Sequence, residues 1–212
     1  MQPLKMLQAM HETLNVDYKD GVMSFQTLLN YVASKFTFKT PINVPWMKVE
    51  TLNKLDEIFD IEVLRSYPWD WFGELHNKLG LQIIDNSLLV GQIYVEANSK
   101  FIAKQSSDTA APLRVLDDET FTGRNIIEMW KHNNHAVYYG VETDMTAYRI
   151  ALLNMKCYGI PSSILFAPPG ADIREFSPNW RDANNWSPST SRIFPDETDE
   201  RRRFLNGFNV IV

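Results

Sequence analysis

Hydrophobic positions between residues 114 and 160 switch twice from strand-like runs to helical spacing. A short apolar run at Val115-Leu116 ends in Asp117, and a β-rich run at Ala136–Val141 ends in Glu142. Each run is followed by apolar residues at helical spacing, which are Ile126, Ile127 and Trp130 after the first and Met145, Tyr148, Ala151, Leu152 and Met155 after the second. The order strand, helix, strand, helix with short connections predicts a parallel sheet with right-handed crossovers.

Residues that typically begin or end helices support these boundaries. Asp144 is placed to cap the second helix, and Gly159 is placed to end it. A third strand is expected at Ser162–Phe166, and the last strand at Asn206–Val212. The fold class predicted for this part of the chain is α/β.

The first hundred residues show mainly helical spacing. Ser24 is placed to cap an amphipathic helix, and Trp69–Leu79 forms another helical stretch after Pro68. We therefore predict a helical N-terminal segment at residues 1–105 and an α/β domain at residues 106–212. The helical segment either covers one edge of the sheet or serves as a docking surface. In the second case Trp69 and Trp71 could stack on bases, whereas burial is the alternative role for both rings.

Acidic residues end the first two predicted strands. Ligands of parallel sheets sit beyond the carboxyl ends of the strands, and these ends carry Asp117 and Glu142. An acid about twenty residues after a glycine turn, here Gly123, is the arrangement that holds ribose hydroxyls. The turn itself reads DDETFTG, with the bulky Phe121 where a ligand would approach and with a single glycine. A cofactor site and an empty nucleotide-type fold both remain open on this spacing.

Three stretches of the sequence resemble adenine-specific DNA methyltransferases of the type I modification-subunit kind. The turn DDETFTGR at Asp117–Arg124 is similar to that family's DPACGTGR, and Gly140–Ile160, GVETDMTAYRIALLNMKCYGI, is similar to its GVEIDPTAYRIALLNMLLHGI. Upstream, Asp70–His76 and Gly91–Glu96 occur in the order and at the distances of the family's D-x-x-G-x-(I/L)-(Y/H) and GQFFTP regions. The resemblance covers roughly Asp70 to Ile160 and implies a Rossmann-like class I methyltransferase fold with a truncated sheet, preceded by the helical segment.

The resemblance also implies a cofactor site, but the chain departs from the family at that site. S-adenosylmethionine would be held by Asp117, Thr122, Gly123 and Glu142, with Gln92 lining the pocket. The family's Pro-Ala-Cys-Gly is replaced by Asp118-Glu119-Thr120-Phe121, and Phe121 is expected to close the pocket. The catalytic tetrapeptide of an amide or acid, Pro-Pro and an aromatic is missing, and the sequence stops where that loop would begin, so no catalytic residue is assigned.

Two functions follow from this comparison. The leading hypothesis is a non-catalytic relative of DNA methyltransferases that acts by binding nucleic acid, including single-stranded DNA, or a protein of the transcription, replication or restriction machinery. In this interpretation no cofactor is bound, and the small size and eroded motifs resemble a virus- or plasmid-encoded accessory protein. The alternative is an S-adenosylmethionine-dependent subunit of a split adenine methyltransferase, completed by another chain that supplies the missing loop.

Composition limits where nucleic acid could bind. The 212 residues have a formal net charge of -5, so any contact with phosphate needs a local basic patch. Candidate residues lie in the polar stretch Ser177–Ser191 and in the charged stretch Asp196–Arg203, and they are Trp180, Arg181, Trp186, Arg201, Arg202 and Arg203. The alternatives are a lid packed on the sheet edge for the first stretch and a solvated helical face for the second.

Other chemistry is not indicated. The single cysteine, Cys157, excludes an internal disulfide and is expected to be a packed thiol in a helix. His132 and His135 lack a third ligand, so no metal site is predicted. The sequence has no run of eighteen apolar residues and no signal-peptide core, which predicts a cytoplasmic protein without membrane contact.

Overall fold

The computed structural model describes residues 2–38, 40, 42, 45, 47–81, 100–101, 112–167, 183–187, 208 and 210–211. The predicted division between residues 105 and 106 lies outside this part of the chain, as does the region of Gln92. Within it, the elements follow one another as five helices, then a strand–helix alternation, then a short final strand. The described part thus contains the α/β pattern and the mainly helical start that the sequence predicts.

In the described part of the chain, the sheet has four parallel strands. β1 (Arg114–Asp117), β2 (Val137–Glu142), β3 (Ser162–Phe166) and β4 (Val210–Ile211) lie in the order β3-β2-β1-β4. Every pairing is parallel, and Asp117 of β1 lies opposite Gly140 of β2. The predicted parallel sheet is confirmed, its first three strands match the expected ones closely, and β4 lies within the expected stretch Asn206–Val212.

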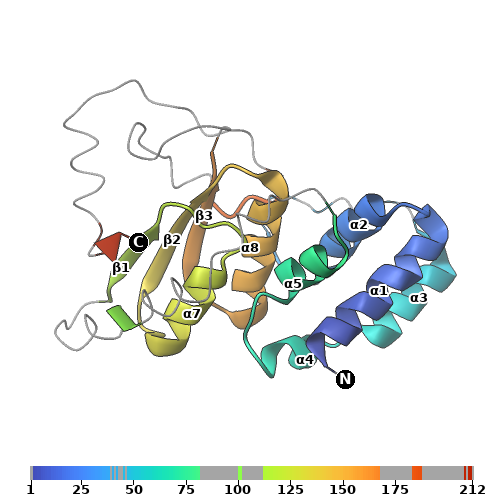
Figure 1. The fold of residues 1–212 in the computed structure, drawn as a ribbon, viewed down its shortest axis with the longest axis horizontal. Coiled ribbons are helices and arrows are strands. Elements are labelled where there is room, and N and C mark those ends of the chain that lie inside the picture. The colour runs from blue at the N-terminus through green and yellow to red at the C-terminus, as the bar shows by residue number, and fades with distance from the viewer. Residues whose placement is uncertain are drawn as a thin grey trace.

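Helices α7 (Arg124–His132) and α8 (Met145–Tyr158) connect the strands and lie on one face of the sheet (Figure 1). Both crossovers advance in the same direction along the sheet, from β1 to β2 to β3, and right-handed crossovers then place their helices on the same side. The side chain of Asp144 accepts a 2.7 Å hydrogen bond from the Ala147 backbone, and Gly159 ends α8 with φ 66°. Both predicted boundary residues of α8 are therefore confirmed.

The N-terminal helices are α1 (Pro3–Tyr18), α2 (Gly21–Ala33), α3 (Val49–Ile58), α4 (Ile61–Arg65) and α5 (Trp71–Lys78). The residue that caps α2 is Asp20, whose carboxylate accepts from the Met23 backbone at 3.0 Å. The prediction that Ser24 caps this helix was wrong. Ser24 lies inside the first turn, where its hydroxyl donates to the Asp20 carbonyl at 2.7 Å, because the aspartate four residues earlier already supplies the cap.

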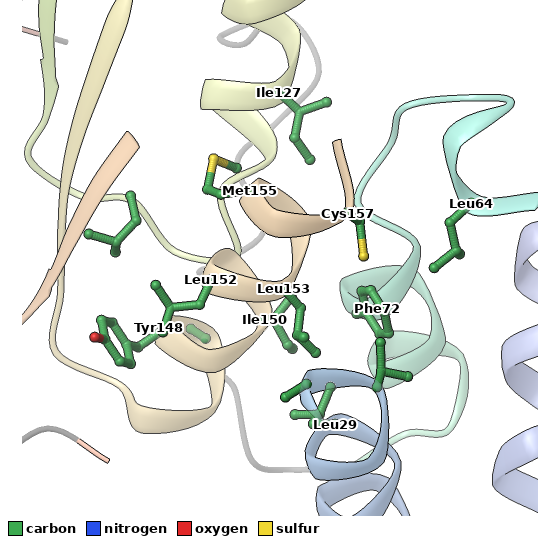
Figure 2. Close-up of a cluster of buried hydrophobic side chains, with 14 of the residues drawn as sticks. Leu29, Leu64, Phe72, Ile127, Tyr148, Ile150, Leu152, Leu153, Met155 and Cys157 are labelled. Carbon is green, nitrogen blue, oxygen red and sulfur yellow. The ribbon is translucent and has the colours of Figure 1, made fainter. Parts of the chain in front are cut away.

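Helix α8 lies between the sheet and the helical segment. Figure 2 shows Tyr148, Leu152 and Met155 on the side of α8 toward the sheet and α7, whereas Ile150, Leu153 and Cys157 point toward α2 and α5. Buried side chains from both parts of the chain belong to one hydrophobic cluster. The described helices of this segment therefore pack on the outer side of α8 rather than on an edge of the sheet (Figure 1), because α8 offers apolar side chains in both directions.

Alternating residues of the strands serve the two faces of the sheet. Val115, Tyr138 and Ile164 belong to the large cluster beneath α7 and α8, whereas Leu116, Val141 and Leu165 form a second, smaller cluster on the opposite face. This alternation is the normal consequence of a two-residue side-chain period. Both faces are buried, as parallel sheets require.

A short segment at residues 183–187 runs beside strand β3. Asn184 donates its backbone N–H to the Ile164 carbonyl and accepts the Ile164 N–H on its side-chain oxygen, both at 2.8 Å. Its amide nitrogen also donates to the Ser162 carbonyl at 2.8 Å. The residue adopts φ 58°, a conformation that asparagine tolerates better than most side chains. One asparagine thus satisfies three backbone groups of β3.

Candidate functional site at the ends of the first two strands

The two acids predicted to define a ligand site lie at the same edge of the sheet. Asp117 ends β1 and Glu142 ends the neighbouring strand β2, and the two side chains are 3% and 5% exposed. Because β1 and β2 are parallel neighbours, their carboxyl ends meet, as the sequence predicts. The structure also brings Thr122 and Gly123 to this edge, in the turn that leads from β1 into α7.

The carboxylate of Asp117 is held by the helix that follows it. Its Oδ2 atom accepts a 3.2 Å hydrogen bond from the side-chain amide of Asn125, a fully buried residue of α7. Burial raises the pKa of Asp117 well above its ordinary value, the bond from Asn125 opposes that rise, and repulsion from Asp118 and Glu142 adds to it. This acid is thus directed into the protein.

The carboxylate of Glu142 is bound to the backbone around it. Its Oε1 atom accepts hydrogen bonds from the Thr143 and Asp144 N–H groups, both at 2.7 Å. Burial raises the pKa of Glu142, and hydrogen bonds from the backbone of Asp144, Thr143 and Phe121 oppose the rise. A carboxylate has about four acceptor positions. The two backbone bonds occupy Oε1, which leaves Oε2 alone for the paired hydroxyls of a ribose.

The turn at residues 118–123 folds back onto the strand ends. The Thr120 backbone donates to the Val141 carbonyl at 3.1 Å, and its hydroxyl donates to the Asp117 carbonyl at 3.1 Å. Thr120 lies directly over Gly140, because a Cβ at that glycine would stand 2.2 Å from the threonine Oγ1 atom. Because Gly140 has no side chain, Thr120 can pack directly against the backbone of β2.

Phe121, at the tip of this turn, adopts a left-handed backbone. Its φ is 48°, a region that costs a bulky side chain about 1–2 kcal/mol. Gly123 also has a positive φ, 81°, and a Cβ there would lie 3.0 Å from Met155 Cε and 3.4 Å from Ala151 Cα. The single glycine of the turn therefore supplies the left-handed residue at the start of α7 and allows that helix to approach α8 closely.

A buried aspartate of the helical segment holds the turn from the other side. Asp70 is fully buried, and its Oδ2 atom accepts from the Thr122 hydroxyl at 2.5 Å while Oδ1 accepts from the Asn154 amide at 2.8 Å. Burial raises the pKa of Asp70, against the attraction of Arg124 and the hydrogen bonds from Thr122 and Asn154. Asn154 also donates to the Thr122 carbonyl at 2.8 Å. Three distant segments therefore meet at Asp70.

Asp70 also caps helix α5, and this explains the glycine that follows it. The Gly73 N–H donates to Asp70 Oδ1 at 2.9 Å, and a Cβ at Gly73 would stand 2.1 Å from Asp70 Oδ2. The pair D-x-x-G is therefore the local signature of this buried carboxylate. In the sequence this motif shows only a resemblance, because the partners of Asp70 lie far along the chain.

Charged and aromatic side chains surround the same junction. Arg124 lies 2.7 Å from Glu74 and 3.5 Å from Asp70, with its guanidinium 4.9 Å from the centre of the Trp69 ring. The Trp69 indole donates to Glu74 at 3.3 Å. The Trp71 indole donates to the Tyr67 carbonyl at 2.9 Å. Both tryptophans are half-buried and take part in contacts within the protein, which favours the packing role for them.

Of the nucleic-acid candidates between residues 177 and 203, the structure describes only Trp186. Its ring is 2% exposed, packs 5.2 Å from the Phe38 ring, and donates through Nε1 to Asn30 Oδ1 at 2.9 Å. A base could not stack on this buried ring, so the structure corrects the predicted nucleic-acid role and favours the alternative, a lid residue packed on the fold. Six other candidates lie outside the described residues, namely Gln92 of the cofactor set and Trp180, Arg181, Arg201, Arg202 and Arg203.

The remaining sequence candidates have simple roles. Cys157 is fully buried, which confirms a packed thiol, and burial raises the pKa of this cysteine to about 12. Among the described residues, no group of three or more His, Cys, Asp or Glu side chains is placed to hold a metal ion. None of the described helices is both long and apolar enough to cross a bilayer.

Comparison with known proteins shows a distant similarity to one solved structure. No family model and no curated protein sequence matches the chain. Among solved structures, the chain is similar to the methyltransferase subunit of the type I restriction-modification system from Streptococcus thermophilus, with 15% sequence identity and a TM-score of 0.40. The match covers 76% of this chain and 38% of that subunit, so this chain corresponds to well under half of the subunit's length.

Proposed function

We propose that this protein is a methyltransferase-like module whose cofactor edge is closed by its own first turn and which acts by binding nucleic acid. The observation that carries the proposal is the seating of residues 118–123 on the carboxyl ends of β1 and β2. Thr120 is hydrogen-bonded to Val141 and packed on Gly140, and Glu142 is turned toward backbone N–H groups.

The residues at this edge do not fit S-adenosylmethionine well. A donor of this type needs a glycine-rich turn that lets the backbone approach, and an acid free to accept from ribose hydroxyls. Here Phe121 occupies the turn, Asp117 is bonded to Asn125, and Glu142 to its neighbours. Opening the turn would also break the bond between Thr122 and Asp70, which lies in the interior.

Methyl transfer to an adenine would need further groups. The exocyclic amine must be held by acceptors near the donor while a ring stacks on the flipped base. The nearest sequence to the expected tetrapeptide is Ala167-Pro168-Pro169-Gly170, which has neither the polar residue nor the aromatic. Binding, rather than catalysis, is the activity that the described residues favour.

The first test is a calorimetric titration with S-adenosylmethionine. We expect no heat of binding with the wild-type protein at concentrations where a working methyltransferase saturates. A matched variant, Phe121→Gly, supplies the glycine that the turn lacks, and a gain of binding in it would locate the block at Phe121. Micromolar binding by the wild-type protein would contradict the closed edge.

The second test concerns the partner. We expect gel shifts with single- or double-stranded DNA that weaken as salt rises, because phosphate contacts release counterions. Absence of any shift at low salt would leave a protein of the transcription, replication or restriction machinery as the partner and would remove nucleic acid from the proposal. An origin in a virus or plasmid belongs to the same proposal and is tested by the genes that neighbour this one.

The alternative function is a subunit of a split adenine methyltransferase. It is favoured by the meeting of Asp117 and Glu142 at one edge and by the long resemblance of residues 140–160 to that family. A second chain would supply the polar-Pro-Pro-aromatic loop. Radiolabelled methyl incorporation by the purified assembly that is lost in Glu142→Ala would establish this function. Unchanged incorporation in that variant would show that Glu142 does not hold the cofactor.

A further inference from the structure

Helix α8 carries two cationic side chains and no acidic one. Its sequence, MTAYRIALLNMKCY, contains Arg149 and Lys156 as the only charged residues. Positions 149 and 156 are separated by two helical turns, which puts both side chains on one face of α8, about 10 Å apart along the axis. In a protein with a net charge of -5, such a pair of cations on a helix that contains no acid is a local positive feature.

Neither cation forms an ion pair with any residue that the structure describes. Arg149 Nη1 lies 3.5 Å from the Gln26 side-chain oxygen, and the buried Nε has no acceptor. By contrast, Arg65 pairs with Glu62 at 2.8 Å and Arg124 with Glu74 at 2.7 Å. Arg149 therefore keeps donors of its guanidinium unused, although burial of such donors without a partner is unfavourable. Burial lowers the pKa of Arg149, in the direction expected for a cation that lacks a counter-charge.

Two aromatic rings that pack against each other at an inclined angle hold these cations in place. The Arg149 guanidinium lies 5.4 Å from the Trp186 ring centre, and the Lys156 ammonium 5.5 Å from that of Phe38. The two rings pack against each other at 5.2 Å, and Trp186 is fixed by its bond to Asn30. The cations are thus positioned by aromatic contacts, which leave their hydrogen-bonding groups available for an anion.

A cavity of about 240 Å³ adjoins the lysine. Among the described residues, its polar lining comes from Lys156, Ser162 and Asn184, and none of these carries a carboxylate. A phosphate oxygen entering here would meet the Lys156 ammonium group, and the rest of this described lining is uncharged. The planar guanidinium of Arg149 suits a second phosphate, because its donors match the geometry of phosphate oxygens.

We propose that Arg149 and Lys156 form a phosphate-binding face on α8 that contacts the backbone of a nucleic-acid strand. This inference rests on the proposed function and names the surface that performs it. The face contacts phosphates only. Trp186 and Phe38 hold the two cations and do not reach bases. Affinity should then depend on salt and hardly on sequence.

The test is fluorescence anisotropy with a labelled single-stranded DNA of mixed sequence, between about 50 and 200 mM salt. Removing two phosphate contacts reduces the slope of log K against log salt by about 1.4 for a single strand. We expect this change in Arg149→Gln/Lys156→Gln, with affinity lower by roughly 25-fold at about 0.1 M salt from the counterion term alone. The charge-matched control is Lys35→Gln/Lys48→Gln, whose lysines pair with Asp56 and Asp17 and whose loss should leave the slope unchanged.

Two further variants keep the test decisive if the double variant does not fold. Lys156→Gln should reduce the slope by about 0.7. Arg149→Lys retains the charge and should keep the wild-type slope. An unchanged slope in Lys156→Gln and in a folded double variant, with wild-type binding intact, would overturn this face and leave the proposed function standing. Failure of the wild-type protein to bind the oligonucleotide would overturn both.

Discussion

Asp70 Oδ2 accepts a hydrogen bond from the Thr122 hydroxyl at 2.5 Å, across 52 positions of the sequence and between two different layers of the fold. The aspartate caps α5 in the helical segment, whereas the threonine belongs to the turn after β1. The same carboxylate is bonded to Asn154 of α8. The position of the turn on the sheet is thus set from outside the sheet.

Removal of the Asp70 carboxylate should destabilise the protein strongly. Asp70→Ala leaves the Thr122 hydroxyl, the Asn154 amide and the Arg124 charge without their shared partner, and breaking such buried sets costs about 3–5 kcal/mol. Urea unfolding measures the loss. The control, Asp60→Ala, removes the exposed cap of α4 and should cost only about 1 kcal/mol. Equal losses in the two variants would show that the buried contacts add nothing to a simple helix cap.

Substitution of Gly73 should be nearly as harmful as loss of the carboxylate. In Gly73→Ala the new Cβ would collide with Asp70, which is buried and cannot move away, at a cost of about 1–3 kcal/mol or more. Gly21→Ala is the control, because its Cβ would meet only Leu81 at 3.4 Å at the start of a helix, where alanine is favourable. Thermal unfolding of both variants separates a steric effect from a general effect of replacing glycine. A Tm for Gly73→Ala at or above the wild-type value would refute the collision.

The pH dependence of stability should reflect the raised pKa of Asp117, the buried acid that ends β1. Because its pKa is raised in the folded protein, Asp117 contributes stability that is fully present below its ordinary value of 3.8 and is lost as pH rises through the folded value. Asp117→Asn should therefore be more stable than wild type at neutral pH and should show a flatter pH profile. Denaturant unfolding across acidic to neutral pH measures this.

Asp56, an aspartate whose pKa shifts in the opposite direction, provides the comparison. Lys35 and Tyr31 lower the pKa of Asp56, so its stabilising effect is present at neutral pH and is lost as pH falls. Asp56→Asn should accordingly be less stable than wild type at neutral pH, with the difference vanishing in acid. If both asparagine variants changed stability in the same direction, the assignment of opposite pKa shifts would be wrong.

Asn184 should protect the outer edge of β3. Asn184→Gly keeps the positive φ available but removes the side chain that bonds Ile164 and Ser162, so about 1–2 kcal/mol of stability should be lost. Asn184→Ala loses the same bonds and adds backbone strain, and should be lower still. Hydrogen exchange at the Ile164 amide should quicken in both variants. Unchanged exchange there would mean that another group covers this edge.

The sequence predicts the elements that depend on local pattern. The parallel sheet, α7 and α8 follow from apolar periodicity and short connections, and the meeting of Asp117 with Glu142 follows from the rule that neighbouring parallel strands end together. Asp144 and Gly159 mark the ends of α8 through local capping chemistry. These features involve few residues that are distant in sequence.

The roles that the sequence does not reveal depend on distant partners. Trp186 lies in a polar stretch typical of a mobile loop, yet its partner Asn30 is 156 positions away. The seating of Thr120 depends on the missing side chain of Gly140, which a pattern of strand residues does not expose. Asp70 shows locally only as D-x-x-G, and its partners Thr122 and Asn154 are tertiary neighbours.

The placement of α8 between two layers governs how the chain can be dissected. Its outer side chains, among them Ile150, Leu153 and Cys157, are covered by the N-terminal helices rather than by water. A truncated protein that retained only the sheet and its crossovers would display this apolar stripe to solvent and should aggregate. Genetic or biochemical work that assigns separate tasks to the two halves therefore needs point substitutions in the intact polypeptide instead of deletions.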